Sequence, residues 1–186
     1  MALKSPEELR AALAGPVAST PTLFRRDGAI DFDGLRHFID FVIAGGTSAI
    51  MLTYGDSLYS ILSDHEVAEV TRVAVEHTAG RALVVAADRI WATPQEIEFA
   101  QYVRDLGADM LMVLPPDWAG SCTVQTLVEH YAAVAVHIPV IVVTNLFAGR
   151  QAMGMEVMRT LCDTVPGVVA VKDDVVGAFG RKLALA

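Results

Sequence analysis

The chain has 186 residues, of which 53% are hydrophobic and 19% are charged. This length predicts a single domain over residues 1–186, and this composition excludes a largely disordered chain. The formal net charge is −8 and the basic residues form no cluster larger than a pair, so neither nucleic acid nor a membrane is an expected partner.

The chain begins with a helix signal. Ser5-Pro6-Glu7-Glu8 is a capping box with proline at the first helical position. No apolar signal core precedes it, which predicts a cytoplasmic protein. Cys122 and Cys162 lie far apart without a CxxC pair, so neither a disulfide framework nor a zinc site is expected.

Six short apolar runs predict buried β-strands. From the second run onward their centres recur roughly every 30 residues, which is the length of one strand and one crossover helix. The runs cover residues 16–18, 49–52, 82–87, 110–114, 139–143 and 168–171.

Amphipathic segments between the runs predict the crossover helices. Capping boxes start at Ser63 and Thr93, Thr123 caps the next helix, and residues 153–165 form another. The five histidines (His37, His65, His77, His130 and His137) form no ligand pair, so they are expected at the surface or at helix ends, without a metal.

A strand followed by a helix, six times over, predicts an α/β fold with a parallel sheet and right-handed crossovers. Either an open doubly wound sheet or part of a TIM (β/α)8-type barrel satisfies this order. A nucleotide-binding doubly wound sheet should carry a glycine-rich turn after its first strand. The segment Ser19-Thr20-Pro21 follows the first strand here without GxGxxG, which favours an incomplete barrel with about six βα units.

Lys172 is the first charge after the last apolar run. The carboxyl ends of parallel strands are where α/β folds place their chemistry. A partly desolvated lysine there can lose its proton and attack a carbonyl carbon to form a Schiff base. A solvated lysine at the end of a strand is the alternative, and Asp173 and Asp174 would favour its charged form.

Several strand ends together resemble the dihydrodipicolinate synthase / N-acetylneuraminate lyase family of pyruvate-dependent class I aldolases. The matching segments follow the family's order over nearly the whole chain. They are Gly15-Pro16-Val17-Ala18-Ser19-Thr20-Pro21, Thr53-Tyr54-Gly55-Asp56, Leu62-Ser63-Asp64-His65-Glu66, Gly107-Ala108-Asp109, Pro115-Pro116, Ile138-Pro139-Val140-Ile141 and Gly167-Val168-Val169-Ala170-Val171-Lys172.

The resemblance implies a (β/α)8 barrel, assembled as a homo-oligomer, in which Lys172 condenses with pyruvate or another 2-oxo acid. It implies that Thr53, Tyr54 and Gly55 hold the substrate carboxylate, and Arg150 resembles the family's arginine after the fifth strand. The lysine supplies the electron sink, so neither a metal nor an organic cofactor is expected.

The sequence also departs from the family pattern. Tyr54 stands where a second threonine is expected, and Asp56 where a glutamate is expected. The position of the family's proton-shuttling tyrosine falls on Val143 or on Asn145, depending on the alignment, and neither can replace a phenol. These departures, with the turn at residues 115–118, argue against the lysine-pathway synthase reaction itself.

Six βα units cannot close a barrel that needs eight strands. The sequence is therefore expected to be part of a longer enzyme, to assemble with partners that cover the gap, or to form an open six-stranded sheet. Two hypotheses follow: a Schiff-base aldolase or lyase that acts through Lys172, or a catalytically inert relative with a binding or assembly role. Asp88-Arg89, after the third strand, either lines the pocket or lies in a solvated loop.

Overall fold

The computed structural model describes residues 4–116, 120–175 and 179–185. Six parallel strands form one sheet in the order β1-β2-β3-β4-β5-β6. Their bounds are β1 Val17–Ser19, β2 Ala49–Met51, β3 Leu83–Ala87, β4 Met110–Val113, β5 Val140–Val143 and β6 Val168–Lys172. The strand order follows the chain without the reversal that a doubly wound sheet requires, so the open doubly wound alternative is wrong.

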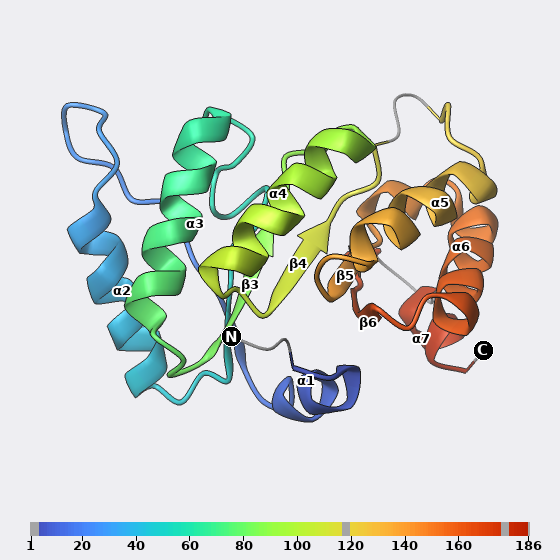
Figure 1. Cartoon of the computed structure of the whole chain (residues 1–186), viewed down its shortest axis with the longest axis horizontal. Coiled ribbons are helices and arrows are strands. Elements are labelled where there is room, and N and C mark those ends of the chain that lie inside the picture. Colours follow the sequence, from blue (N-terminus) through green and yellow to red (C-terminus); the bar gives the residue numbers. More distant parts are fainter. Residues whose placement is uncertain (1–3, 117–119, 176–178, 186) are drawn as a thin grey trace.

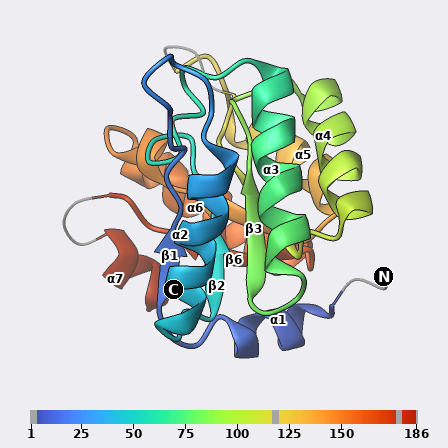
Figure 2. The same ribbon diagram turned by 90° about the vertical axis from the view of Figure 1, so that its left-hand side faces the viewer.

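Helices follow the strands and cover the outside of the curled sheet, while α1 lies across one end of it (Figure 1). The side view shows α2, α3 and α4 side by side on the outer surface (Figure 2). The helices are α1 Pro6–Ala12, α2 Phe32–Ala44, α3 Asp64–Thr78, α4 Thr93–Leu106, α5 Val124–Ala135, α6 Gln151–Thr164 and α7 Phe179–Ala184, with a 3₁₀ turn η1 at Asn145–Phe147. This is the incomplete (β/α) barrel that the sequence predicts.

The helix starts show how local chemistry fixes the crossovers. The capping boxes predicted at Ser5 and Ser63 are confirmed, and so is the cap predicted at Thr123, which also forms a capping box. The box predicted at Thr93 is wrong: Ala92 is the N-cap, and it makes no side-chain hydrogen bond. Glu96 is fully buried instead of folding back over the helix end.

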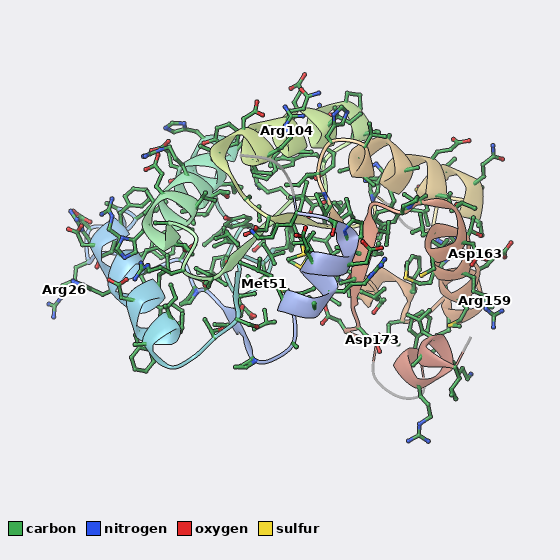
Figure 3. All side chains as sticks on the ribbon, turned by 60° about the horizontal axis from the view of Figure 1, so that its bottom comes forward. Arg26, Met51, Arg104, Arg159, Asp163 and Asp173 are labelled. Atoms are coloured by element: carbon green, nitrogen blue, oxygen red, sulfur yellow. The ribbon has the colours of Figure 1, made fainter. Side chains whose placement is uncertain are left out.

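The core lies between the sheet and its outer helices. Every residue of β3, β4 and β5 is buried, as central parallel strands require. The first strand is at the edge of the sheet, and Val17 is 38% exposed. The basic side chains of Arg26, Arg104 and Arg159 lie far apart on the periphery (Figure 3). Among the described residues, no helix is long and apolar enough to cross a membrane.

Two close contacts hold segments that flank the sheet. One joins α1 to β6, and the other brings the η1 turn after β5 against α6. Arg10 of α1 donates from Nε to the Val169 carbonyl oxygen of β6 at 3.2 Å, which ties the first helix to the last strand. Gly154 of α6 lets the η1 turn approach closely, because a Cβ there would lie 2.6 Å from Phe147. Parallel strands bring their carboxyl ends to one edge of the sheet, and the loops at that edge form the pocket described next.

Candidate active site

A pocket of about 260 Å³ lies at the carboxyl ends of β2, β4, β5 and β6. Its volume is near the lower limit of ligand pockets, which typically span roughly 300–1,000 Å³. It therefore suits a small molecule of a few carbon atoms. The lining residues are Thr53, Tyr54, Gly55, Asp56, Met112, Leu114, Val143, Asn145, Lys172 and Asp174.

Lys172 is the last residue of β6 and pairs in register with Val143 of β5. Its side chain is 32% exposed, so the amine is partly withdrawn from water without being sealed off. Both carboxylate oxygens of Asp174 accept from Lys172 Nζ, Oδ1 at 2.5 Å and Oδ2 at 2.7 Å. The predicted strand-end lysine thus faces a pocket, and its one ion-pair partner among the described residues is Asp174.

The loop after β2 forms the facing wall. Thr53 Oγ1 accepts from the backbone N–H groups of Asp56, at 2.8 Å, and Ser57, at 3.3 Å. The Thr53 N–H donates to Ser57 Oγ at 2.8 Å. These bonds fold the loop into a tight turn that places Tyr54 and Gly55 against the pocket.

Two backbone donors in this turn are available to a ligand. Within the part of the chain that the structure describes, the N–H groups of Tyr54 and Gly55 donate to no hydrogen-bond acceptor. Adjacent backbone N–H groups in a turn form a concave site that favours an anion. Ser19 Oγ donates to Asp56 Oδ2 at 2.7 Å, which binds the Asp56 carboxylate to the end of β1.

Thr144 organises the two acids after Lys172, and the sequence analysis did not single it out. Thr144 Oγ1 donates to Asp173 Oδ1 at 2.7 Å and accepts from the Asp174 N–H at 3.0 Å. Asp173 Oδ1 also accepts from the Val175 N–H at 3.2 Å. Asp173 is therefore used in fixing the loop, while Asp174 lies against Lys172. The signal for this role was the position of Thr144, a residue with a hydroxyl directly after β5, which pairs with the strand that carries the lysine.

The two positions considered for the family tyrosine, Val143 and Asn145, both line the pocket. Neither side chain can carry a proton between donors and acceptors. Tyr54 brings a phenol into the pocket from β2. The turn residues Asp117 and Trp118 lie outside the described residues.

Arg150 lies away from this pocket. It is the N-cap residue of α6, and its Nη2 donates to the Cys122 carbonyl oxygen at 3.0 Å. It is not among the described residues that line the pocket. Binding of a substrate carboxylate by Arg150 would require a different side-chain position.

A second polar cluster is buried at the end of β3 and on α4, and its two acids do not line the pocket. Asp88 and Glu96 are fully buried, so neither predicted position for Asp88, in the pocket or in a solvated loop, is correct. Asp88 Oδ2 accepts from the Leu114 N–H at 2.9 Å. Asp88 Oδ1 and both Glu96 carboxyl oxygens are buried and accept from no other donor among the described residues, so the two acids form a side-chain hydrogen bond with each other when one of them holds a proton.

Burial decides the protonation of these acids. It raises the pKa of Asp88 to about 7, against the opposing effect of the Leu114 N–H. Burial raises the pKa of Glu96 well above its usual value, and the neighbouring charge of Asp88 raises it further. The pair therefore keeps at least one proton at neutral pH.

His130 belongs to the same buried region. It is 3% exposed, so its predicted surface position is wrong. Its Nδ1 pairs with Thr93 Oγ1 at 2.9 Å, and burial lowers its pKa to about 4, which keeps the ring neutral. Within the described ranges, no group of three or more His, Cys, Asp or Glu side chains is arranged to hold a metal ion.

The fold and the site together define a partial parallel (β/α)-barrel protein. Its sixth strand ends in a lysine that faces the turn after its second strand. The model of the dihydrodipicolinate synthetase family matches residues 12–182. The chain therefore belongs to this family.

Individual relatives agree with this assignment. The chain is 32% identical over 165 residues to the 4-hydroxy-tetrahydrodipicolinate synthase of Methylibium petroleiphilum, covering 87% of this chain and 55% of the relative. It is 34% identical over 171 residues to a protein of Streptomyces avermitilis named "Probable 5-dehydro-4-deoxyglucarate dehydratase 2", covering 90% and 50%. The chain thus spans about half the length of the curated relatives that it matches.

The fold is similar to solved structures as well. The crystal structure of dihydrodipicolinate synthase from Aquifex aeolicus superposes with a TM-score of 0.73 at 25% identity. The superposition covers 88% of this chain and 56% of that one. The six strands and their helices therefore correspond to part of that barrel.

Proposed function

We propose that this chain carries the reactive half of a class I aldolase-type lyase or synthase. In this proposal Lys172 forms a Schiff base with pyruvate or another 2-oxo acid, and a C–C bond next to the iminium forms or breaks. The observation that carries the proposal is the position of Lys172 in a small pocket, opposite a turn with two backbone N–H groups that have no acceptor among the described residues.

Each part of the pocket has a chemical use in this reaction. The N–H groups of Tyr54 and Gly55, on the turn fixed by Thr53, would bind the substrate carboxylate. Lys172 would then be within reach of the adjacent ketone carbon. A cationic imine at that carbon accepts the electrons of the neighbouring carbanion, which lowers the barrier to an enamine.

Membership of the family supports the class of reaction, but it does not identify the particular substrate. The relatives include one protein named as a synthase and one named as a probable dehydratase, and these names denote different reactions. Asp56, Asp174 and Lys172 all line the pocket, and Lys172 pairs with Asp174, so the lining carries one carboxylate without an ion-pair partner among the described residues, that of Asp56. This charge disfavours a substrate with a second carboxylate near Asp56, which supports a monocarboxylate 2-oxo acid.

We also propose a cytoplasmic homo-oligomer. The edges of β1 and β6 are the two ends of the open sheet, and open parallel edges favour association. The molar mass in solution, measured by light scattering, checks this part of the proposal. A mass equal to one chain would contradict it.

Reductive trapping tests the covalent chemistry. The protein is incubated with pyruvate and sodium borohydride, and the modified residue is located by peptide mass spectrometry. We expect one reduced pyruvyl group on Lys172, and none on the Lys172→Arg variant, which keeps the charge but cannot form an imine.

The Lys182→Arg variant is the matched control, because Lys182 is an exposed lysine on α7. It should be labelled at Lys172 as the wild type is. An unchanged intact mass of the wild type would refute the covalent mechanism and favour the alternative of a catalytically inert family member.

A further inference from the structure

The two acidic residues after Lys172 have different structural roles. The Asp173 carboxylate accepts from the Thr144 hydroxyl and the Val175 N–H, so it fixes the loop. The Asp174 carboxylate accepts only from Lys172 Nζ among the described residues, through both oxygens. The Asp174 backbone is held in turn by its N–H bond to Thr144. The fold therefore aims one carboxylate at the reactive amine.

Few other groups in this pocket could transfer protons at the amine. Met112, Leu114 and Val143 carry no exchangeable proton, and the Asn145 amide does not titrate. Of the remaining lining residues that titrate, Asp56 accepts from Ser19 at the end of β1. Tyr54 lies on the opposite wall, on the turn after β2. Among the described residues, Asp174 alone has a titratable side chain in contact with Lys172 Nζ.

We propose that Asp174 is the proton-transfer group of Schiff-base formation in this chain, in direct contact with the Lys172 amine. This inference rests on the proposed function and assigns a residue to its first chemical step. It replaces a tyrosine-based transfer, for which Val143 and Asn145 are unsuited, by a carboxylate supplied from the loop after β6.

The steps balance without any further reagent. Asp174 takes a proton from the Lys172 ammonium, and the neutral nitrogen forms a bond to the ketone carbon as the C=O π electrons move to oxygen. That oxygen takes the proton from Asp174, and the nitrogen then gives a second proton to the carboxylate. Asp174 passes this proton to the carbinolamine hydroxyl, the C–O bond breaks, and water leaves. The nitrogen lone pair completes the iminium, and Asp174 is again a carboxylate.

Lys172 must lose a proton before its nitrogen can attack the ketone, and the contact gives that proton a direct path to Asp174. Transfer within the pair leaves two neutral groups, which cost less to desolvate than two charges. A bound 2-oxo acid that displaces water from the pocket would therefore shift the pair toward the neutral amine. In this role the ion pair is the resting state and the bound substrate initiates the transfer.

The test compares the initial rates of adduct formation in three proteins. Wild type, Asp174→Asn and Asp163→Asn are incubated with pyruvate and cyanoborohydride, at a reductant concentration above which the rate no longer increases. Each variant loses one carboxylate, but Asp163 is an exposed residue of α6 that does not line the pocket. General acid–base groups contribute typically 10²–10⁴-fold, so we expect Asp174→Asn to form the Lys172 adduct about 10²-fold more slowly. We expect Asp163→Asn to form it at the rate of the wild type.

A chemical rescue separates proton transfer from a structural role. In Asp174→Ala, added acetate or formate can occupy the vacated space and accept the proton. We expect these anions, and not chloride at equal ionic strength, to raise the rate of adduct formation. Circular dichroism melts verify that both Asp174 variants are folded.

The outcomes distinguish this inference from the proposed function. If wild type forms the adduct and Asp174→Asn forms it as fast or faster, Asp174 merely restrains the amine and the inference is overturned while the function stands. The same conclusion follows if carboxylates fail to rescue Asp174→Ala. If no protein forms an adduct at Lys172, both the function and the inference are overturned.

Discussion

The buried pair of Asp88 and Glu96 predicts an unusual dependence of stability on pH, which the substitution Glu96→Gln tests. Both acids are fully buried, and burial raises both of their pKa values. In the unfolded chain a glutamate releases its proton at about pH 4.3. The folded protein therefore binds more protons than the unfolded chain between about pH 4 and about pH 7, and its free energy of unfolding falls as the pH rises through this range.

The magnitude follows from one retained proton. Each proton that only the folded state holds changes the free energy of unfolding by about 1.4 kcal/mol per pH unit. From about pH 5 to about pH 7, Glu96 thus contributes a loss of roughly 3 kcal/mol, and Asp88, with a pKa of about 7, adds a smaller loss. Glu96→Gln has a similar shape and no proton to release, so the contribution of Glu96 disappears in the variant.

The assay is urea unfolding followed by circular dichroism at several pH values from about 5 to about 7. We expect the slope of the free energy of unfolding against pH to be shallower in Glu96→Gln by about 1.4 kcal/mol per pH unit. The control is Glu98→Gln, which removes an exposed carboxylate from the same helix and should leave the slope unchanged. Equal slopes for wild type and Glu96→Gln would refute the argument, because Glu96 would then release its proton in the folded state as it does in the unfolded chain.

Three further substitutions test buried positions. Tyr59→Phe should lower the free energy of unfolding by about 1 kcal/mol, because the Tyr59 hydroxyl lies 3.0 Å from Thr71 Oγ1. Tyr131→Phe should be neutral or stabilising, because the Tyr131 hydroxyl is buried without a partner among the described residues, and a larger loss for Tyr131 than for Tyr59 in thermal or urea melts would contradict this reasoning. Gly154→Ala should cost about 1–3 kcal/mol, since its Cβ would lie 2.6 Å from Phe147, and an unchanged melting temperature would show that the η1 turn moves freely.

The strands and most helix starts could be predicted from the sequence because their signals are local. A run of apolar residues between polar turns, such as residues 139–143, is long enough to specify a buried strand by itself. The caps at Ser63 and Thr123 are likewise contained within four residues. The resemblance of the strand ends to the family then indicated a barrel. Periodicity alone also allowed an open doubly wound sheet.

The errors arose where a polar side chain is buried by a distant element. Thr93 and Glu96 have the spacing of a capping box, yet Glu96 is enclosed with Asp88 of the preceding loop and Thr93 pairs with His130 of α5. His130 lies between Leu127 and Val134 at helical spacing, which was a signal for the buried face of α5. The burial of Asp88 depends on packing between neighbouring βα units, which no local pattern encodes.

The candidate site could be predicted in part, for a related reason. Lys172 and the turn at residues 53–56 were found because each follows a strand and matches a family segment. The roles of Thr144 and Asp174 depend on the register between β5 and β6, in which Val143 pairs with Lys172. One residue of slip in that register would move Thr144 away from both acids, so their arrangement is a property of the paired strands.

The pocket residues differ in how fully the sheet surrounds the strands that carry them. The groups assigned to carboxylate binding lie in the turn after β2, a strand with sheet neighbours on both sides. Val143 lies on β5, which is flanked in the same way. Lys172 lies on β6, at the edge of the sheet, so only its β5 side is enclosed by a strand of this chain. The Lys172 side chain is 32% exposed, and the Asp174 carboxylate contacts its amine. Imine formation needs the amine, the ketone and a proton acceptor in contact, and all the protein groups assigned to it lie within residues 53–174, so reductive trapping on this chain tests the chemistry directly.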